Sequence, residues 1–184
     1  TISVVEMVLA GGINKALVAA IAQAGGCAVG ISGTDGGLIT ARKLMATAKT
    51  EGSAIEEAID LGFVGEPEHV DTGVLDALNV AKLIPVVAPV GSDGSGETYN
   101  INADTAAGAI AAALGATRML MLTDVAGVLD SDGNLITDLT VSQAEALIRD
   151  GTVSGGMIPK VETCINAVLG LSLIHISEPT RRPI

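Results

Sequence analysis

The chain has 184 residues, of which 48% are hydrophobic and 1% aromatic, and its formal net charge is −11. This length suffices for one sizeable domain, whose core must be built from aliphatic side chains because aromatic residues are almost absent. The negative charge argues against binding to nucleic acid or to anionic membranes, since phosphate binding depends mostly on Lys and Arg. An anionic ligand would have to be held by locally placed cations and backbone N–H groups.

The N-terminal region predicts two helices separated by a glycine pair. Apolar residues recur at helical spacing over residues 2–10, and Gly11-Gly12 ends this first helix. A second helix starts with Asn14 as its cap and ends at Gly25-Gly26. A short buried strand, "CAVGIS" (27–32), follows and leads into the turn "GTDGG".

The middle of the chain predicts strands, a hairpin and a helix. Residues 38–44 are expected to form a strand, and residues 45–60 to be partly loop and partly helix. "LGFVGEPEHVD" is expected to be an edge strand or a hairpin, because Pro67 lacks the N–H that a sheet ladder needs. A helix over 72–81, a buried strand over 83–90 and the loop or hairpin turn "GSDGSGET" come next.

The second half alternates in the same way. A helix is expected over 103–114 and a strand over 118–124, and "SDGN" forms a turn. Thr140 caps a helix that Gly151 ends, and a last helix covers 157–169 after the loop "TVSGG". Helices and continuous apolar strands alternate, which predicts an α/β fold with a mainly parallel sheet covered on both faces.

Residues 171–184, "LSLIHISEPTRRPI", break this pattern and show no helical period. Residues 171–181 match the in-frame translation of a transposon-end sequencing adapter, and the alternative is a genuine disordered tail. We therefore expect residues 1–170 to be the domain and residues 171–184 to be a non-native tail.

The cysteines and the apolar runs bear on the compartment. Cys27 and Cys164 lie far apart and form no CxxC pattern, which predicts two buried thiols in a reducing compartment. No charged segment followed by an apolar one opens the sequence, so no signal peptide is predicted. The longest apolar run, 106–116, is shorter than the roughly 18 residues of a membrane span. These features predict a soluble, cytoplasmic protein.

Open α/β sheets bind ligands beyond the carboxyl ends of their strands, so polar residues that follow a strand are candidates. "YNINAD" (99–104) precedes a helix of small residues, whose free N–H groups favour anions. Asn100 is suited to donate to a substrate carboxylate or amide, and Asp104 to accept from a lysine. The alternative is plain capping, with Asn102 as the N-cap and Asp104 as a first-turn acid, and the frequency of such caps favours it.

Two further candidate segments lie in the second half. Gly127 in "TDVAGVLD" either admits a nucleotide or marks a simple turn, and Asp124 and Asp130 carry little weight as Mg²⁺ ligands. In "SGGMIPK", Gly155-Gly156 at a helix start let the backbone approach phosphates, and Lys160 lies one turn inside the helix. The alternative for this segment is a flexible loop with a solvated lysine.

The sequence lacks the motifs of several other sites. GxxxxGK[ST], GxGxxG and HExxH do not occur. His69 and His175 have no cluster of partners in the sequence, which argues against a metal site or a histidine-based site.

Taken together, "VVEMVLAGGINKALVAAIAQAGGCAVGISGTDGGLITARK", "YNINAD", "LTDVAGVLD" and "SGGMIPKVETC" closely resemble the acetylglutamate kinases of the amino acid kinase family. The resemblance covers residues 1 to about 169. It implies a three-layer αβα sandwich around a mainly parallel sheet. It also implies phosphorylation of the side-chain carboxylate of N-acetyl-L-glutamate to N-acetyl-glutamyl 5-phosphate, in arginine biosynthesis. ATP is the implied phosphate donor, with Mg²⁺ held by the nucleotide.

The resemblance also assigns residues. Asn100 binds acetylglutamate, Asp104 orients catalytic lysines and Lys160 stabilises the transferring phosphoryl group. A substrate carboxylate is already ionised at neutral pH, so the reaction needs charge neutralisation and positioning rather than a general base. The residues implied to hold the nucleotide are Asp124, Val125, Ala126, Gly127, Val128, Leu129, Thr152, Val153, Ser154, Gly155, Gly156 and Met157.

The resemblance covers part of the family's chain. The family's first strand with its phosphate-contacting Lys, a Gly-Gly loop and an Arg would precede Thr1, and further strands and helices would follow residue 169. We therefore expect a fold that is incomplete at both ends, an inactive fragment, and a homo-oligomer for the full-length protein. The alternatives are a glutamate, uridylate or carbamate kinase of the same superfamily, or a non-catalytic nucleotide-binding protein.

Overall fold

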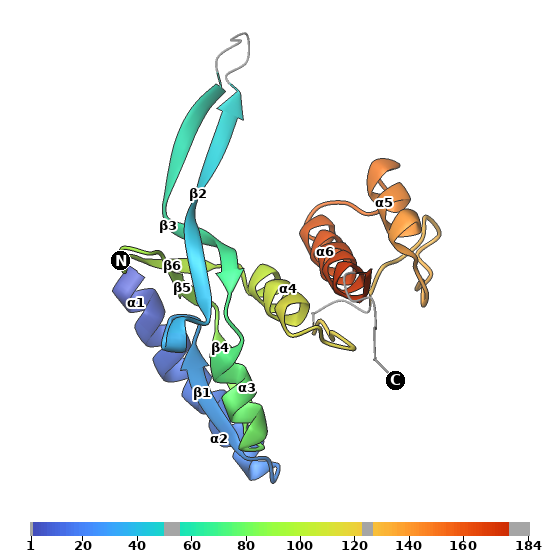
Figure 1. Cartoon of the computed structure of the whole chain (residues 1–184). Coiled ribbons are helices and arrows are strands. Elements are labelled where there is room, and N and C mark those ends of the chain that lie inside the picture. Colours follow the sequence, from blue (N-terminus) through green and yellow to red (C-terminus); the bar gives the residue numbers. More distant parts are fainter. Residues whose placement is uncertain (1, 50–55, 123–126, 177–184) are drawn as a thin grey trace, which may run out of the picture. The chain divides into compact units, whose positions relative to one another are not determined.

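The computed structural model describes residues 2–49, 56–122 and 127–176, and the chain divides into two compact units, 1–106 and 107–184 (Figure 1). Each unit is described by itself below. The first unit contains all six strands of the described residues, and the second contains the helices Val141–Arg149 and Met157–Ile176.

A long helix opens the first unit. It consists of α1 (Ile2–Glu6), a π-helical segment η1 (Met7–Ile13) and α2 (Asn14–Gln23). The prediction that Gly11-Gly12 ends a helix is wrong, because the chain runs through this pair in the wider π-helical winding. Asn14 has helical backbone angles (φ −56°, ψ −49°), so the prediction that it caps a new helix is also wrong.

Asn14 instead joins the helix to a sheet. Its side chain is 2% exposed and donates to the carbonyl oxygens of Ile31 at 3.1 Å and Val86 at 2.8 Å. The neighbouring Lys15 Nζ donates to the Gly30 carbonyl at 3.0 Å. A buried amide needs such partners, so these bonds fix how the helix lies against the strands.

That sheet is a parallel pair of strands. β1 (Ala28–Ser32) pairs with β4 (Ile84–Ala88) in one continuous register, from Ala28 opposite Ile84 to Ser32 opposite Ala88. α2 contacts both strands, and α3 (Gly73–Val80) contacts β4. The predicted strands at 27–32 and 83–90 and the helix at 72–81 are confirmed, except that the second strand ends at Ala88, before Pro89.

A second sheet closes on itself. It contains β2 (Ile39–Lys49), β3 (Glu56–Val70), β5 (Val90–Ser92) and β6 (Thr98–Ile101). β2 pairs antiparallel with β3 and β5 with β6, whereas β3 and β6 are parallel. The long hairpin of β2 and β3 extends away from α2 and α3 (Figure 1).

This hairpin corrects one prediction and confirms another. Residues 45–49 and 56–60 are strand, not loop and helix, because pairing with a neighbouring strand overrides the weak helical preference of Ala and Glu. Residues 61–71, expected to be an edge strand or a hairpin, form up to Val70 one strand of this hairpin, and that strand also pairs with β6. Pro67 lies opposite Ala41 next to a shift of register, a position where a missing N–H is tolerated.

The core of the first unit lies mainly inside the closed sheet and beside it. Leu38, Ile39, Val90 and Ile101 are at most 2% exposed, and Tyr99 is 7% exposed. The side chains that alternate with these along β6, Thr98 and Asn100, are less buried. The core thus fixes the inner face of β6, and the side chains of its other face are half-buried.

The helices of the second half are confirmed. α4 (Ala103–Ala113) links the two units in sequence, and α5 (Val141–Arg149) packs against α6 (Met157–Ile176) around Ala144, Val153 and Val161. Thr140 and Gln143 form a capping box at the start of α5, and Gly151, with φ +82°, follows its end.

Two predictions for the second half are wrong. Residues 118–122 form no strand, and Leu120 and Leu122 are 80% and 95% exposed; an apolar run becomes a strand only when another strand pairs with it. Residues 123–124 of that predicted strand lie outside the described residues. α6 continues to Ile176, so residues 171–176 are helical where a non-helical tail was expected.

The structure also differs from the sequence predictions about the two cysteines and about apolar segments of membrane-spanning length. Cys27 and Cys164 are exposed rather than buried. In the described part of the chain, the 22-residue helix Ile2–Gln23 is long and apolar enough to cross a membrane by length and composition alone. The sequence prediction considered only the uninterrupted run 106–116 and missed it. Within the first unit, Asn14 and Lys15 bond this helix to β1 and β4.

Candidate functional site

The structure separates the two asparagines of "YNINAD". Asn102 lies just before α4, and its Oδ1 accepts hydrogen bonds from the Thr105 N–H at 3.1 Å and the Thr105 hydroxyl at 3.3 Å. This is the geometry of an N-cap. Asn100 lies in β6, opposite Val64 of β3 and Val90 of β5, and no hydrogen bond within the described residues involves its side chain. Capping therefore accounts for Asn102 but not for Asn100.

β6 holds Asn100 in place through the residues on its buried face. Tyr99 and Ile101 are buried, and Asn100 is half-buried on the opposite face. A Cβ atom added to Gly65 of the neighbouring strand would lie 2.6 Å from the Tyr99 Cβ, so only glycine permits this close approach. One added to Gly91 would lie 2.8 Å from the Ile101 Cδ1.

The loop before β6 is held by an aspartate. Asp93 Oδ1 accepts from the backbone N–H groups of Ser95 and Glu97, both at 2.9 Å, and from the Ser95 hydroxyl at 2.7 Å. Its Oδ2 accepts from the Tyr99 hydroxyl at 3.3 Å. Hydrogen bonds from Ser95 and Glu97 hold the pKa of Asp93 below its usual range. These contacts tie the loop to the strand that carries Asn100.

Asp104 and Lys160 occupy helix starts in different units. Asp104 is half-buried in the first turn of α4, where an acid complements the helix dipole. Lys160 is half-buried in the first turn of α6. Asn100 and Asp104 belong to the first unit and Lys160 to the second, so their joint action stays a prediction.

The second unit brings together two segments that are distant in sequence. A pocket of about 240 Å³ lies between the segment 127–130 and the segment 152–157. The sequence predicted both segments as nucleotide contacts, whereas Asp124, Val125 and Ala126 lie outside the described residues. The residues that line the pocket are Gly127, Val128, Leu129, Asp130, Thr152, Val153, Ser154 and Met157.

One wall of this pocket is a tight turn built on Asp130. Its Oδ1 accepts from the N–H groups of Asp132 at 2.9 Å and Asn134 at 2.8 Å, and Ile136 N–H donates to the Val128 carbonyl at 2.9 Å. The predicted turn at "SDGN" is thereby confirmed. Hydrogen bonds from Asn134 hold the pKa of Asp130 below its usual range, so the carboxylate is charged at neutral pH.

The other wall leads into α6. Val153 is buried and its N–H donates to the Leu147 carbonyl at 2.9 Å, which fixes this segment against α5. Gly155 has φ +56°, a conformation that favours glycine. Within the described residues, no hydrogen bond uses the N–H groups of Gly155 and Gly156. The start of α6 therefore offers N–H donors to an anion, and phosphate binding there stays a prediction.

Two structural roles were not predicted from the sequence. Asp130 was weighed only as a metal ligand, although it directly follows "DVAGVL" and lines the pocket. The sequence predicts Asn14 as a cap because it follows a glycine pair, and no local sequence signal indicates that its amide reaches two strands. Among the described residues, no three His, Cys, Asp or Glu side chains are grouped as a metal site would require.

Helices packed on a parallel strand pair and a glycine-rich helix start beside a pocket are typical of α/β proteins that bind phosphorylated ligands. A model of the amino acid kinase family matches residues 1–176. The chain therefore belongs to the amino acid kinase family, and the expected α/β fold of that family is confirmed. Of the family's parallel sheet, the described residues contain the pair β1 and β4.

More particularly, the chain is similar to curated bacterial proteins named acetylglutamate kinase. It is 67% identical over 167 residues to that of Acidiphilium cryptum (strain JF-5), which covers 91% of this chain and 56% of the relative. It is 59% identical over 170 residues to that of Parvibaculum lavamentivorans, which covers 92% of this chain and 56% of the relative. The chain thus spans little more than half the length of these curated relatives.

Solved structures give the same fold. The crystal structure of smu.665 from Streptococcus mutans UA159 has a TM-score of 0.77 at 27% identity, covering 92% of this chain and 64% of that one. The N-acetylglutamate synthase of Neisseria gonorrhoeae, complexed with coenzyme A and N-acetyl-glutamate, has a TM-score of 0.70 at 24% identity. This similarity covers 88% of this chain and 34% of the synthase chain.

Proposed function

We propose that the chain is a large part of an acetylglutamate kinase, which transfers a phosphoryl group from ATP to the side-chain carboxylate of N-acetyl-L-glutamate in arginine biosynthesis. The observation that carries this proposal is the 67% identity to a protein of that name over 91% of the chain. Two observations support it: Asn100 is half-buried with no hydrogen bond to its side chain among the described residues, and the 240 Å³ pocket is lined by parts of the two segments that the resemblance assigns to the nucleotide.

The substrate carboxylate attacks phosphorus without a general base, because it is ionised at neutral pH. The enzyme has to offset the repulsion between that carboxylate and the phosphates, and to align the two. In this proposal Asn100 donates to acetylglutamate from β6, and Lys160 neutralises the charge that develops on the transferring group. Asp104 accepts from a catalytic lysine and so positions it.

The nucleotide would lie in the pocket between the segments 127–130 and 152–157, with its phosphates toward the N–H groups at the start of α6. The pocket's 240 Å³ is below the roughly 300–1,000 Å³ of pockets that enclose a whole ligand, so it would hold part of the nucleotide. Mg²⁺, which neutralises phosphate charge, would be held mainly by the nucleotide phosphates, as is usual for this ion in kinases.

The remaining expectations belong to the same proposal. The protein would act in the cytoplasm on a small molecule, without nucleic acid or membrane as a partner, and would be a homo-oligomer as a full-length protein. The acidic composition, with a formal net charge of −11, supports the first part.

A substrate panel tests the proposed activity. Because the chain spans 56% of its relative, residues 2–169 would replace the matching segment of the Acidiphilium cryptum protein. ADP release from ATP would then be measured with acetylglutamate, glutamate, uridylate or carbamate as the acceptor. We expect turnover with acetylglutamate at a rate near that of the unaltered relative. Turnover that depends on another acceptor would contradict the proposal.

A further inference from the structure

Asp130 is the one charged side chain among the described residues that line the nucleotide pocket. The others are small, apolar or hydroxylic: glycine, valine, leucine, threonine, serine and methionine. A single carboxylate in such a lining is an acceptor of hydrogen bonds and repels phosphate. Whatever part of a ligand lies next to it must therefore be an uncharged or positively charged donor.

The two oxygens of this carboxylate are used unequally. Oδ1 accepts from the N–H groups of Asp132 and Asn134 and holds the turn together. Oδ2 accepts only from the Asn134 side-chain amide, at 3.1 Å, among the bonds of the described residues. Because a carboxylate offers about four acceptor positions, Oδ2 keeps at least one for a ligand.

The two ends of the pocket differ in chemistry. The segment 152–157 leads to the glycine N–H groups at the start of α6, which suit phosphate, whereas Asp130 lies on the opposite segment. The part of a nucleotide that is uncharged, donates hydrogen bonds and is joined to the phosphates is the ribose. Carboxylates bind ribose hydroxyls in this way in other nucleotide-binding α/β proteins.

We propose that Asp130 accepts a hydrogen bond from a ribose hydroxyl of the bound nucleotide and thereby makes the site selective for ribonucleotides over deoxyribonucleotides. This inference rests on the proposed function, since it assigns a specificity to the same nucleotide site. Loss of the hydrogen bond between the ribose hydroxyl and the charged carboxylate should lower the affinity for the nucleotide about ten- to a hundredfold.

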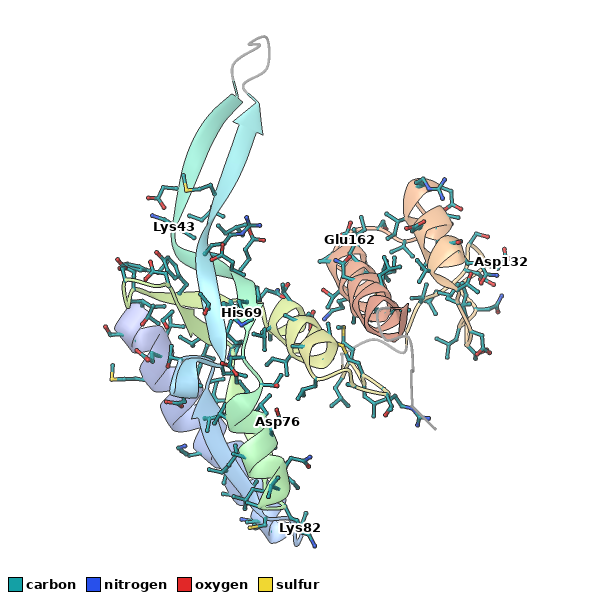
Figure 2. All side chains as sticks on the ribbon, in the orientation of Figure 1. Lys43, His69, Asp76, Lys82, Asp132 and Glu162 are labelled. Carbon is teal, nitrogen blue, oxygen red and sulfur yellow. The ribbon has the colours of Figure 1, made fainter. Side chains whose placement is uncertain are left out.

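The test compares nucleotides on the 184-residue chain by isothermal titration calorimetry. ATP, 2′-deoxy-ATP and 3′-deoxy-ATP are each titrated into the unaltered chain and into Asp130→Asn. Asparagine keeps Oδ1 as the acceptor that the turn requires, but replaces Oδ2 with an amide that donates. Asp132→Asn is the matched control, because it removes the same charge from the same turn without lining the pocket (Asp132 is labelled in Figure 2).

The unaltered chain and Asp132→Asn should bind ATP about ten- to a hundredfold more tightly than at least one deoxy analogue. Asp130→Asn should bind ATP as weakly as that analogue, with the analogue's own affinity unchanged. If ATP and both analogues bind the unaltered chain equally, or if Asp130→Asn weakens all three alike, the inference is wrong while nucleotide binding stands. If no nucleotide binds, the proposed site fails and the inference with it.

Discussion

Replacing the buried Asn14 by alanine should destabilise the first unit by about 2–4 kcal/mol. The substitution removes the two hydrogen bonds that the amide donates, to the carbonyls of Ile31 at 3.1 Å and Val86 at 2.8 Å, and the 3.5 Å bond that its Oδ1 accepts from Lys15. Each such bond contributes about 0.5–1.5 kcal/mol, and a buried acceptor left without its donor costs about 1–3 kcal/mol. The side chain is 2% exposed, so water cannot replace the amide without a rearrangement.

The assay is urea unfolding of the 184-residue chain, monitored by tyrosine fluorescence. Tyr99 is the single tyrosine, the chain has no tryptophan, and Tyr99 is buried in the first unit, so the signal reports that unit. We expect a lower midpoint with an unchanged slope, as a change in stability alone produces. Lys15→Ala is the control, because Lys15 is exposed and donates to one backbone carbonyl, that of Gly30 at 3.0 Å, besides a longer bond of 3.5 Å to the Asn14 Oδ1.

A loss of less than about 1 kcal/mol in Asn14→Ala, or a loss no larger than that of Lys15→Ala, would refute this reasoning. It would mean that the amide does not hold the helix Ile2–Gln23 to the strands β1 and β4.

Three further predictions concern the site and its loops. In the chimeric enzyme, Lys160→Ala should lower kcat by about a hundredfold or more with little change in the acetylglutamate KM, because its charge matters most in the transition state; an unchanged kcat would exclude a catalytic role. Asn100→Ala should raise the acetylglutamate KM and leave Tm nearly unchanged. Asn102→Ala should cost about 1 kcal/mol of stability and leave KM unchanged. A lower Tm with an unchanged KM in Asn100→Ala would mean that Asn100 has a structural role. The pKa of Asp93 is lower in the folded chain than in the unfolded chain. The carboxylate therefore contributes to stability at pH values above its unfolded-state pKa, and this contribution is lost as the pH falls through its folded-state pKa. When the pH is lowered below about 4, the urea midpoint of the unaltered chain should therefore decrease, and that of Asp93→Asn should decrease less. An equal pH dependence of the two midpoints would contradict the role assigned to Asp93.

Local sequence signals predicted the elements whose cause is local. Thr140 and Gln143 form their capping box from residues three apart, and Gly151 ends α5 through its own backbone conformation. The resemblance of "DVAGVL" and "TVSGGM" to a known family assigns both segments to the nucleotide, and the structure places described parts of both in one pocket, whereas nucleotide binding there stays a prediction.

The predictions that failed depend on partners that are distant in sequence. Residues 45–60 are predicted to be partly loop and partly helix, yet in the described parts, 45–49 and 56–60, β2 and β3 pair through their backbones, which composition does not encode. Residues 118–122 are apolar enough for a strand, but none of the described strands pairs with them. Asn14 looked like a cap from its neighbours, and its actual partners are 17 and 72 residues away.

The central claim is that these residues serve to phosphorylate a carboxylate, and trapping the product tests it most directly. The chimera that contains residues 2–169 would be incubated with ATP, acetylglutamate and hydroxylamine, and the products identified by mass spectrometry. An acyl phosphate reacts with hydroxylamine, so we predict the 5-hydroxamate of acetylglutamate in an amount equal to the ADP formed. ADP release without the hydroxamate would show that ATP is hydrolysed or that another group is phosphorylated, and would contradict the claim.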